Sequence, residues 1–196
     1  MLLSISTTTN ACWLREQVPD TNYITSDTAV IQRITGYAGH MAGIFDFSAL
    51  PAAANIYLAK IYLLLNQAPS GAAAGKNIDV FRVLQALNVN QMTWNIYATG
   101  LSWNVAGAGA EGVDFTAALS ASAVLPATAT WVAVNVTDMV KYAQVNCSKI
   151  LKCVIKPATN WATSSDSITV VASAGTGKPR LDLLYSYGGR NKIQIF

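Results

Sequence analysis

Short runs of β-forming residues, each bounded by turn formers such as Gly, Pro, Asn and Asp, recur along the whole chain. This alternation predicts strands at residues 11–15, 28–34, 42–47, 55–65, 78–84, 131–136, 150–155, 168–172 and 180–185. We expect further strands beside the tryptophans, at 92–97 and 102–105, and one more short strand at 112–117. About ten strands in one chain are typical of an antiparallel β-sandwich, and we predict an all-β fold of the jelly-roll type.

One short helix is predicted directly after the strand at 131–136. Asn135 or Thr137 is expected to cap its N-terminus, and Asp138 suits the positive end of the helix dipole. An apolar stripe follows within residues 139–143, which is the spacing of a helix that buries one side.

The strand predicted at residues 55–65 is the longest of the set. Its side chains alternate between two faces, and both faces are mainly apolar, with Leu58 and Tyr62 on one and Ile61 and Leu63 on the other. A strand with two apolar faces is typical of the centre of a sheet that is covered on both sides. We predict this position for it.

The chain has unusually few charges for a soluble protein of 196 residues. Charged residues make up 12%, apolar residues 52%, and the mean hydropathy is +0.32, whereas about 25% charged residues are typical. So few charges leave part of the surface uncharged, and contiguous apolar surface usually marks contact with another molecule. We interpret the chain as one that works inside an assembly.

Several other classes of protein lack support in the sequence. The strongest apolar run, residues 56–65, is interrupted by Lys60 and is too short for a membrane-spanning helix, so we expect no membrane partner. The first residues show no secretory signal, which predicts synthesis in a cytoplasm. The net charge of +3 is spread along the chain, so we expect no nucleic-acid partner.

Metal sites and catalysis are likewise unsupported. The three cysteines have no C-x-x-C spacing and the chain has a single histidine, so we expect free thiols and neither a metal nor a cofactor. His40 has no neighbouring nucleophile pattern, and the two glutamates, Glu16 and Glu111, belong to no recognisable constellation. We therefore predict a protein that is not an enzyme.

Several segments are similar to a known family when they are read in chain order. These are Pro19-Asp20-Thr21-Asn22-Tyr23, the segment Gly43 to Pro51 with its Phe45-Asp46-Phe47-Ser48, the strand Ala54 to Leu65, Val80-Phe81-Arg82-Val83, Met92-Thr93-Trp94-Asn95 followed by Trp103, Asn135-Val136-Thr137 with Val140, and Pro179-Arg180-Leu181 leading to Tyr185. In this order the chain resembles the DNRLRE domain, also described as disaggregatase-related, which is close to carbohydrate-binding modules. Ile24 departs from the pattern, because a glycine is usual there.

The resemblance implies a jelly-roll β-sandwich without catalysis, used in adhesion, sugar binding or surface display. Such domains usually belong to large secreted proteins, whereas we expect this copy to stand alone without a signal. By analogy of context, a stand-alone copy resembles a phage virion structural protein, which is made in the host cytoplasm and assembles there.

We expect one domain at residues 1–186 and a C-terminal extension at 187–196. Ile193, Ile195 and Phe196 are apolar where a free tail would be polar, and we interpret them as oligomer contacts on an arm that adds to a neighbouring subunit. The alternative is that the tail folds back on its own domain.

Trp161 lies in a predicted loop and is the residue we expect to be exposed and to contact a glycan, with a protein contact as the alternative. Trp94 and Trp131 lie in strand-like segments and are expected in the core.

The leading hypothesis is a non-enzymatic virion structural protein, either a capsid decoration or cement protein or a component of the head or tail surface. Its partners are then further copies of itself, with a trimer among the expected arrangements, and a larger protein lattice such as a capsid. The alternative is a carbohydrate-binding or adhesion module with a glycan as its ligand.

Overall fold

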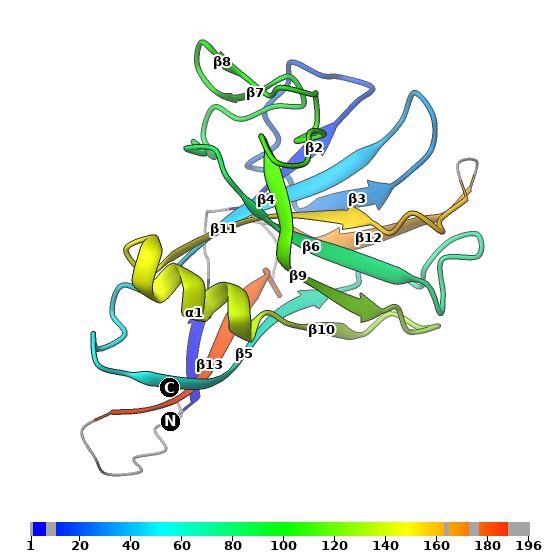
Figure 1. Ribbon diagram of the computed structural model, residues 1–196. Helices are drawn as coiled ribbons and strands as arrows, with labels where there is room; N and C mark the ends of the chain where they lie inside the picture. Colours follow the sequence, from blue (N-terminus) through cyan, green and yellow to red (C-terminus); the bar gives the residue numbers. More distant parts are fainter. Residues whose placement is uncertain (1, 7–10, 163–164, 173–176, 188–196) are drawn as a thin grey trace.

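The computed structural model describes residues 2–6, 11–162, 165–172 and 177–187 (Figure 1). Within them the chain forms thirteen strands and one helix. In chain order they are β1 (Leu2–Ser6), β2 (Ala11–Arg15), β3 (Thr28–Gln32), β4 (Gly39–Asp46), β5 (Asn55–Leu64), β6 (Asn77–Val83), β7 (Ile96–Ala98), β8 (Leu101–Ser102), β9 (Phe115–Val124), β10 (Trp131–Asn135), α1 (Thr137–Asn146), β11 (Ile150–Pro157), β12 (Ser167–Val171) and β13 (Arg180–Ser186).

Two antiparallel sheets form the sandwich. The smaller has the order β1-β13-β5-β10; the larger has the order β12-β3-β4-β11-β6-β9, with β2 also paired to β4. Four strand pairs are nested within one another along the chain. The outermost is β1 with β13, followed by β4 with β11, β5 with β10 and, innermost, β6 with β9. A long hairpin rolled up in this way is a jelly roll. The predicted all-β sandwich with one short helix is confirmed.

The main core lies between the inner faces of the two sheets, and α1 closes one end of it. Ala59, Ile61 and Leu63 of β5 are fully buried there. Met139 and Val140 of α1 join the same core, as the predicted apolar stripe requires.

The helix begins differently from the prediction. Val136 occupies the N-cap position and makes no side-chain cap bond, so the predicted cap at Asn135 or Thr137 is wrong. Asn135 Oδ1 instead accepts from the backbone N of Thr137, at 3.1 Å, and Thr137 Oγ1 accepts from Ala59 N, at 2.9 Å. The helix start is therefore tied to β5 rather than closed by a cap.

A second core lies on the outer face of the larger sheet, under the long segment 84–114. Trp94 and Trp103 from this segment are 9% and 4% exposed and pack with Leu14, Ala42 and Val154 of the sheet. The strands predicted at 92–97 and 102–105 are wrong in extent, because only the small hairpin β7–β8 forms there. The strand predicted at 112–117 is β9, which begins later and runs to Val124.

The prediction for the long strand is half correct. β5 lies between β13 and β10, inside its sheet. Its outward side chains Leu58, Tyr62 and Leu64 are only half-buried, so the expected cover on both faces is wrong. Among the described residues no helix is long and apolar enough to cross a membrane.

Candidate interaction surface

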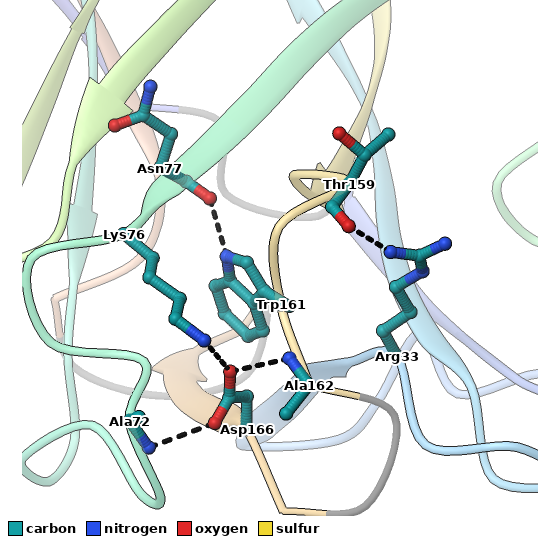
Figure 2. Close-up of polar contacts among 8 residues, drawn as sticks. All are labelled: Arg33, Ala72, Lys76, Asn77, Thr159, Trp161, Ala162 and Asp166. Atoms are coloured by element: carbon teal, nitrogen blue, oxygen red, sulfur yellow. Dashed lines mark hydrogen bonds and ion pairs between the residues drawn. The ribbon is translucent and has the colours of Figure 1, made fainter.

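Trp161, the predicted glycan contact, is buried rather than exposed. Its exposure is 2%, and its indole Nε1 donates to Asn77 O at 2.6 Å (Figure 2). The loop around it is held by Arg33, whose guanidinium donates to Thr159 O. The expectation of an exposed ring is wrong, because the ring joins the main core and leaves no face free for stacking on a sugar.

The same loop is held by a buried carboxylate. Asp166 is fully buried and accepts from Lys76 Nζ at 2.5 Å, from Ala72 N at 2.8 Å and from Ala162 N at 2.7 Å (Figure 2). Burial alone would raise the pKa of the Asp166 carboxyl, but these three donors outweigh it and the pKa lies below its ordinary value. Gly71 is required beside it, because a Cβ there would lie 2.8 Å from Asp166 Oδ1 and its φ is +63°.

The cluster around Asp166 joins two loops through hydrogen bonds to the Asp166 carboxylate. Within the described residues, the donors to Asp166 come from the loops at 71–76 and 162, and both carboxylate oxygens accept hydrogen bonds. The cluster in Figure 2 therefore stabilises the fold. The predicted oligomer contacts Ile193, Ile195 and Phe196 lie outside the described residues.

A second set of titratable groups, Lys156, Asp114 and the half-buried His40, lies on the covered face of the larger sheet. Lys156 Nζ donates to Ala108 O and lies 3.8 Å from the ring centre of Phe115. Burial lowers the pKa of Lys156 to about 8, although the nearby carboxylate of Asp114 opposes the shift. Burial and the charge of Lys156 together lower the pKa of His40 to about 3, so its ring is neutral and Nδ1 donates to Gly107 O at 2.8 Å.

Asp114 completes this set by binding the backbone of its own loop. It is fully buried and accepts from the backbone nitrogens of Asn104, Val105 and Ala110 at 2.8 to 3.0 Å. His40 and Lys156 thus fasten segment 84–114 to the sheet, and Asp114 holds the backbone within that segment. Within the described residues, no three His, Cys, Asp or Glu side chains lie together as metal ligands would.

The outer face of the smaller sheet is different, and we call it the Arg180 face. The register places Arg180 opposite Tyr62, and Tyr62 opposite Ala133 of β10. The Arg180 guanidinium lies 4.4 Å from the ring centre of Trp131 and 4.7 Å from that of Tyr62. The face comprises Leu58, Lys60, Tyr62, Leu64, Trp131, Ala133, Asn135, Arg180, Asp182 and Leu184.

Three of the ten residues of the Arg180 face are ionic. Its ionic side chains are Lys60, Arg180 and Asp182, and Arg180 Nε lies 3.4 Å from Asp182. Trp131 is half-buried here, so its predicted place in the core is wrong. Its strand alternates Trp-Val-Ala-Val-Asn, and Val132 and Val134 take the core side, which leaves Trp131 outside.

A groove of about 290 Å³ lies at one end of this region, between β5, β9 and the start of α1. Its wall includes Tyr57, which is 54% exposed, and Leu119, which is 40% exposed. Ser120, Asn135 and Asp138 add polar side chains to the same groove. It therefore combines an exposed ring with hydrogen-bonding groups.

Sequence reasoning missed the Arg180 face because its residues come from three strands far apart in the chain. Alternation within residues 55–65, 131–136 and 180–185 separates inner from outer positions, but only the pairing of the strands brings Arg180 onto Tyr62 and Trp131. No model of a known protein family matches the chain, and no curated protein is similar to it in sequence.

Proposed function

We propose that this protein is a non-enzymatic structural protein that acts by packing against other protein subunits. The observation that carries the proposal is the Arg180 face, where Trp131, Tyr62 and Arg180 stack on the outside of a sheet. Trp, Tyr and Arg are the residues that most often dominate binding at protein interfaces. Half-buried leucines surround them, as in the apolar centre of an interface.

The stacking also favours binding for an entropic reason. An exposed arginine loses rotamer freedom when a partner covers it, and that loss opposes association. Arg180 is already positioned by two rings and by Asp182 before any partner arrives. The face is therefore partly preorganised for a protein contact.

We extend the proposal to a virion component, either a capsid decoration or cement protein or a part of the head or tail surface, made in the host cytoplasm. The low charge of 12%, the resemblance to the DNRLRE domain and the jelly-roll order of the sheets support this. So does the run of residues 115–137, which contains no charged residue and supplies an edge strand to each sheet, β9 and β10. The expected partners are further copies of the chain, with a trimer among the arrangements, and a larger protein lattice.

The test is the mass of the protein in solution, measured by analytical ultracentrifugation over a range of concentrations. We expect an oligomer for the wild type and a smaller mass for Trp131→Ala and Arg180→Ala. Tyr37→Ala is the matched control, because Tyr37 is 49% exposed and lies in the turn between β3 and β4, away from the face. A wild type that stays monomeric and binds no isolated particle would contradict the proposal.

The C-terminal residues provide a separate test of the assembly arm. Deleting residues 188–196 is expected to leave a folded protein with a smaller oligomer mass, since Ile193, Ile195 and Phe196 are removed. An unchanged mass would remove the arm from the proposal and leave the Arg180 face in it.

The groove beside Tyr57 favours a second candidate, a carbohydrate-binding or adhesion module. Sugar rings stack their apolar side on aromatic faces and bond their hydroxyls to side chains such as Asn135 and Asp138. Binding on a glycan array that Tyr57→Ala abolishes and Tyr37→Ala preserves would support it. Binding that both variants preserve would exclude the groove.

A further inference from the structure

A cavity of about 390 Å³ opens where β6 and β11 separate. The two strands pair only from Arg82 and Cys153 onward, while β11 already begins at Ile150 and there pairs with β4 alone. Beyond Val83 the chain turns away, and Leu84 N donates to Asp114 O at 2.9 Å. The split between the strands, closed on one side by the end of α1, leaves a hollow of the size that small ligands occupy.

The cavity is positively charged. Arg82 and Lys152 line it from its two sides, and none of its lining residues is an Asp or a Glu. Gln85, Asn146 and Ser148 supply neutral hydrogen-bonding groups beside the two cations. A hollow lined by two cations and by no carboxylate attracts an anion.

Neither cation is fully engaged by the protein. Arg82 stacks its guanidinium on the ring of Tyr142, with 4.4 Å to the ring centre, but its buried Nε has no hydrogen-bond acceptor in the described part of the chain. Among the residues that the structure describes, Lys152 Nζ reaches Gln85 O alone, at 3.5 Å. Stacking uses the flat side of a guanidinium and leaves its N–H edge for an oxyanion.

The end of α1 does not account for these charges. Cations often sit near a helix C-terminus to bind its last carbonyls. Here Ala143 O accepts from the backbone nitrogens of both Cys147 and Lys149, at 3.1 and 3.0 Å, and Tyr142 O accepts from Asn146 Nδ2 at 3.0 Å. Two carbonyls near the helix end, Tyr142 O and Ala143 O, thus have partners that are neither Arg82 nor Lys152.

We propose that this cavity binds a small ligand that carries an oxyanion, a carboxylate or a sulfate, held between Arg82 and Lys152. The oxyanion belongs either to an acidic sugar or to a free inorganic anion, and the neutral side chains of Gln85, Asn146 and Ser148 suit the hydroxyls of a sugar. The inference is independent of subunit packing, because the cavity is distinct from the Arg180 face.

Cys147 lines the cavity and provides the readout. It is half-buried, whereas Cys12 and Cys153 are fully buried and burial raises their pKa values to about 11 and about 12. A neutral alkylating agent, iodoacetamide, is therefore expected to modify Cys147 first in the folded protein. Mass spectrometry of the intact protein and its peptides gives the rate at that residue.

The experiment measures this rate with glucuronate, sodium sulfate or glucose at constant ionic strength. Slowing by glucuronate or sulfate, with no effect of glucose, supports the proposal. Glucuronate acting at lower concentration than sulfate assigns an acidic sugar, and equal action assigns a free anion. No slowing by either anion, or equal slowing by glucose, overturns the proposal.

Variants that remove one positive charge test whether Arg82 and Lys152 hold the anion. Arg82→Gln and Lys152→Gln are each expected to raise the concentration for half-protection about tenfold. Lys141→Gln is the matched control, since Lys141 is exposed on α1 and does not line the cavity. If Arg82→Gln fails to fold, Lys152→Gln decides the test, and protection unchanged in it overturns the proposal.

Discussion

The two sheets present opposite kinds of outer face. The outer face of the larger sheet is covered by the chain itself, since segment 84–114, with β7 and β8, packs over β2 and β4 (Figure 1). The Arg180 face of the smaller sheet carries Trp131 and Tyr62 half-buried at its surface.

The polar groups of the two faces also differ in what they bind. On the covered face, Asp114 and Lys156 are bonded to the backbone of the covering loop. On the Arg180 face, Arg180 contacts Asp182, Tyr62 and Trp131 of its own sheet and keeps a third of its side chain exposed. The covered face shows how this chain buries aromatic residues within one molecule, and the Arg180 face presents similar residues that a partner is expected to bury.

The largest expected effect contrasts two tryptophans, one from each face. Trp94→Ala removes a ring that is 9% exposed and packed beside Gly107, so we expect a loss of about 4 kcal/mol in the free energy of unfolding. Trp131→Ala is expected to cost about 1 kcal/mol and to lower the oligomer mass. Urea unfolding of the isolated protein measures both. Equal losses of unfolding free energy would mean that Trp131 contributes as much to the stability of the fold as Trp94 does.

A smaller effect is expected from the carboxylates of the two faces. Asp114→Asn weakens three backbone hydrogen bonds in a fully buried place, and we expect a loss of about 2 kcal/mol. Asp182→Asn removes only the contact with Arg180 and is expected to cost less than about 1 kcal/mol. Thermal unfolding of the two variants compares them. A larger loss for Asp182→Asn would reverse the assignment of the faces.

The pH dependence of stability tests the covered face alone. The pKa of Lys156 is about 8 in the fold and 10.5 ordinarily, so between these values the unfolded chain binds more protons than the folded one. Below about pH 8 the buried Lys156 is charged in the fold and destabilises it by the full amount. As the pH increases from about 8 to about 10.5 this destabilisation is lost, so the free energy of unfolding rises. We expect the difference in unfolding free energy between wild type and Lys156→Met to rise by about 2 kcal/mol over this window.

Taking the difference between the two proteins cancels the contributions of groups that both proteins share. A flat difference for Lys156→Met would show that the ammonium group is hydrated in the fold.

Local spacing was enough to predict much of this fold. The bounds of β2 were predicted to the residue, and those of β10 and β13 to within one, because alternation of side chains depends only on neighbours in the sequence. The second core was not predictable in this way. Segment 84–114 has little regular structure, and its cover over the larger sheet depends on contacts with distant strands.

The site was not predictable from local spacing for the same physical reason. Trp161 lies in a loop, as the sequence indicates, but its burial depends on a hydrogen bond to Asn77, 84 residues earlier. The Arg180 face depends on the pairing of β13 with β5 and of β5 with β10. Turn formers mark where a strand ends, and they do not specify which side of the sheet a loop will cover.

The smallest expected effect concerns the stacking of Arg180 itself. A cation over aromatic rings at a partly exposed site stabilises by about 0.5–1 kcal/mol, so Arg180→Ala is expected to lower the free energy of unfolding of the monomer by no more than that. Arg180→Lys keeps the charge and loses the planar contact with Trp131 and Tyr62, so it separates stacking from charge. Denaturant unfolding of dilute, monomeric protein gives the values. A loss above about 3 kcal/mol in either variant would place Arg180 among the groups that hold the fold together, as Asp114 is on the covered face, and would leave the smaller sheet without a face reserved for a partner.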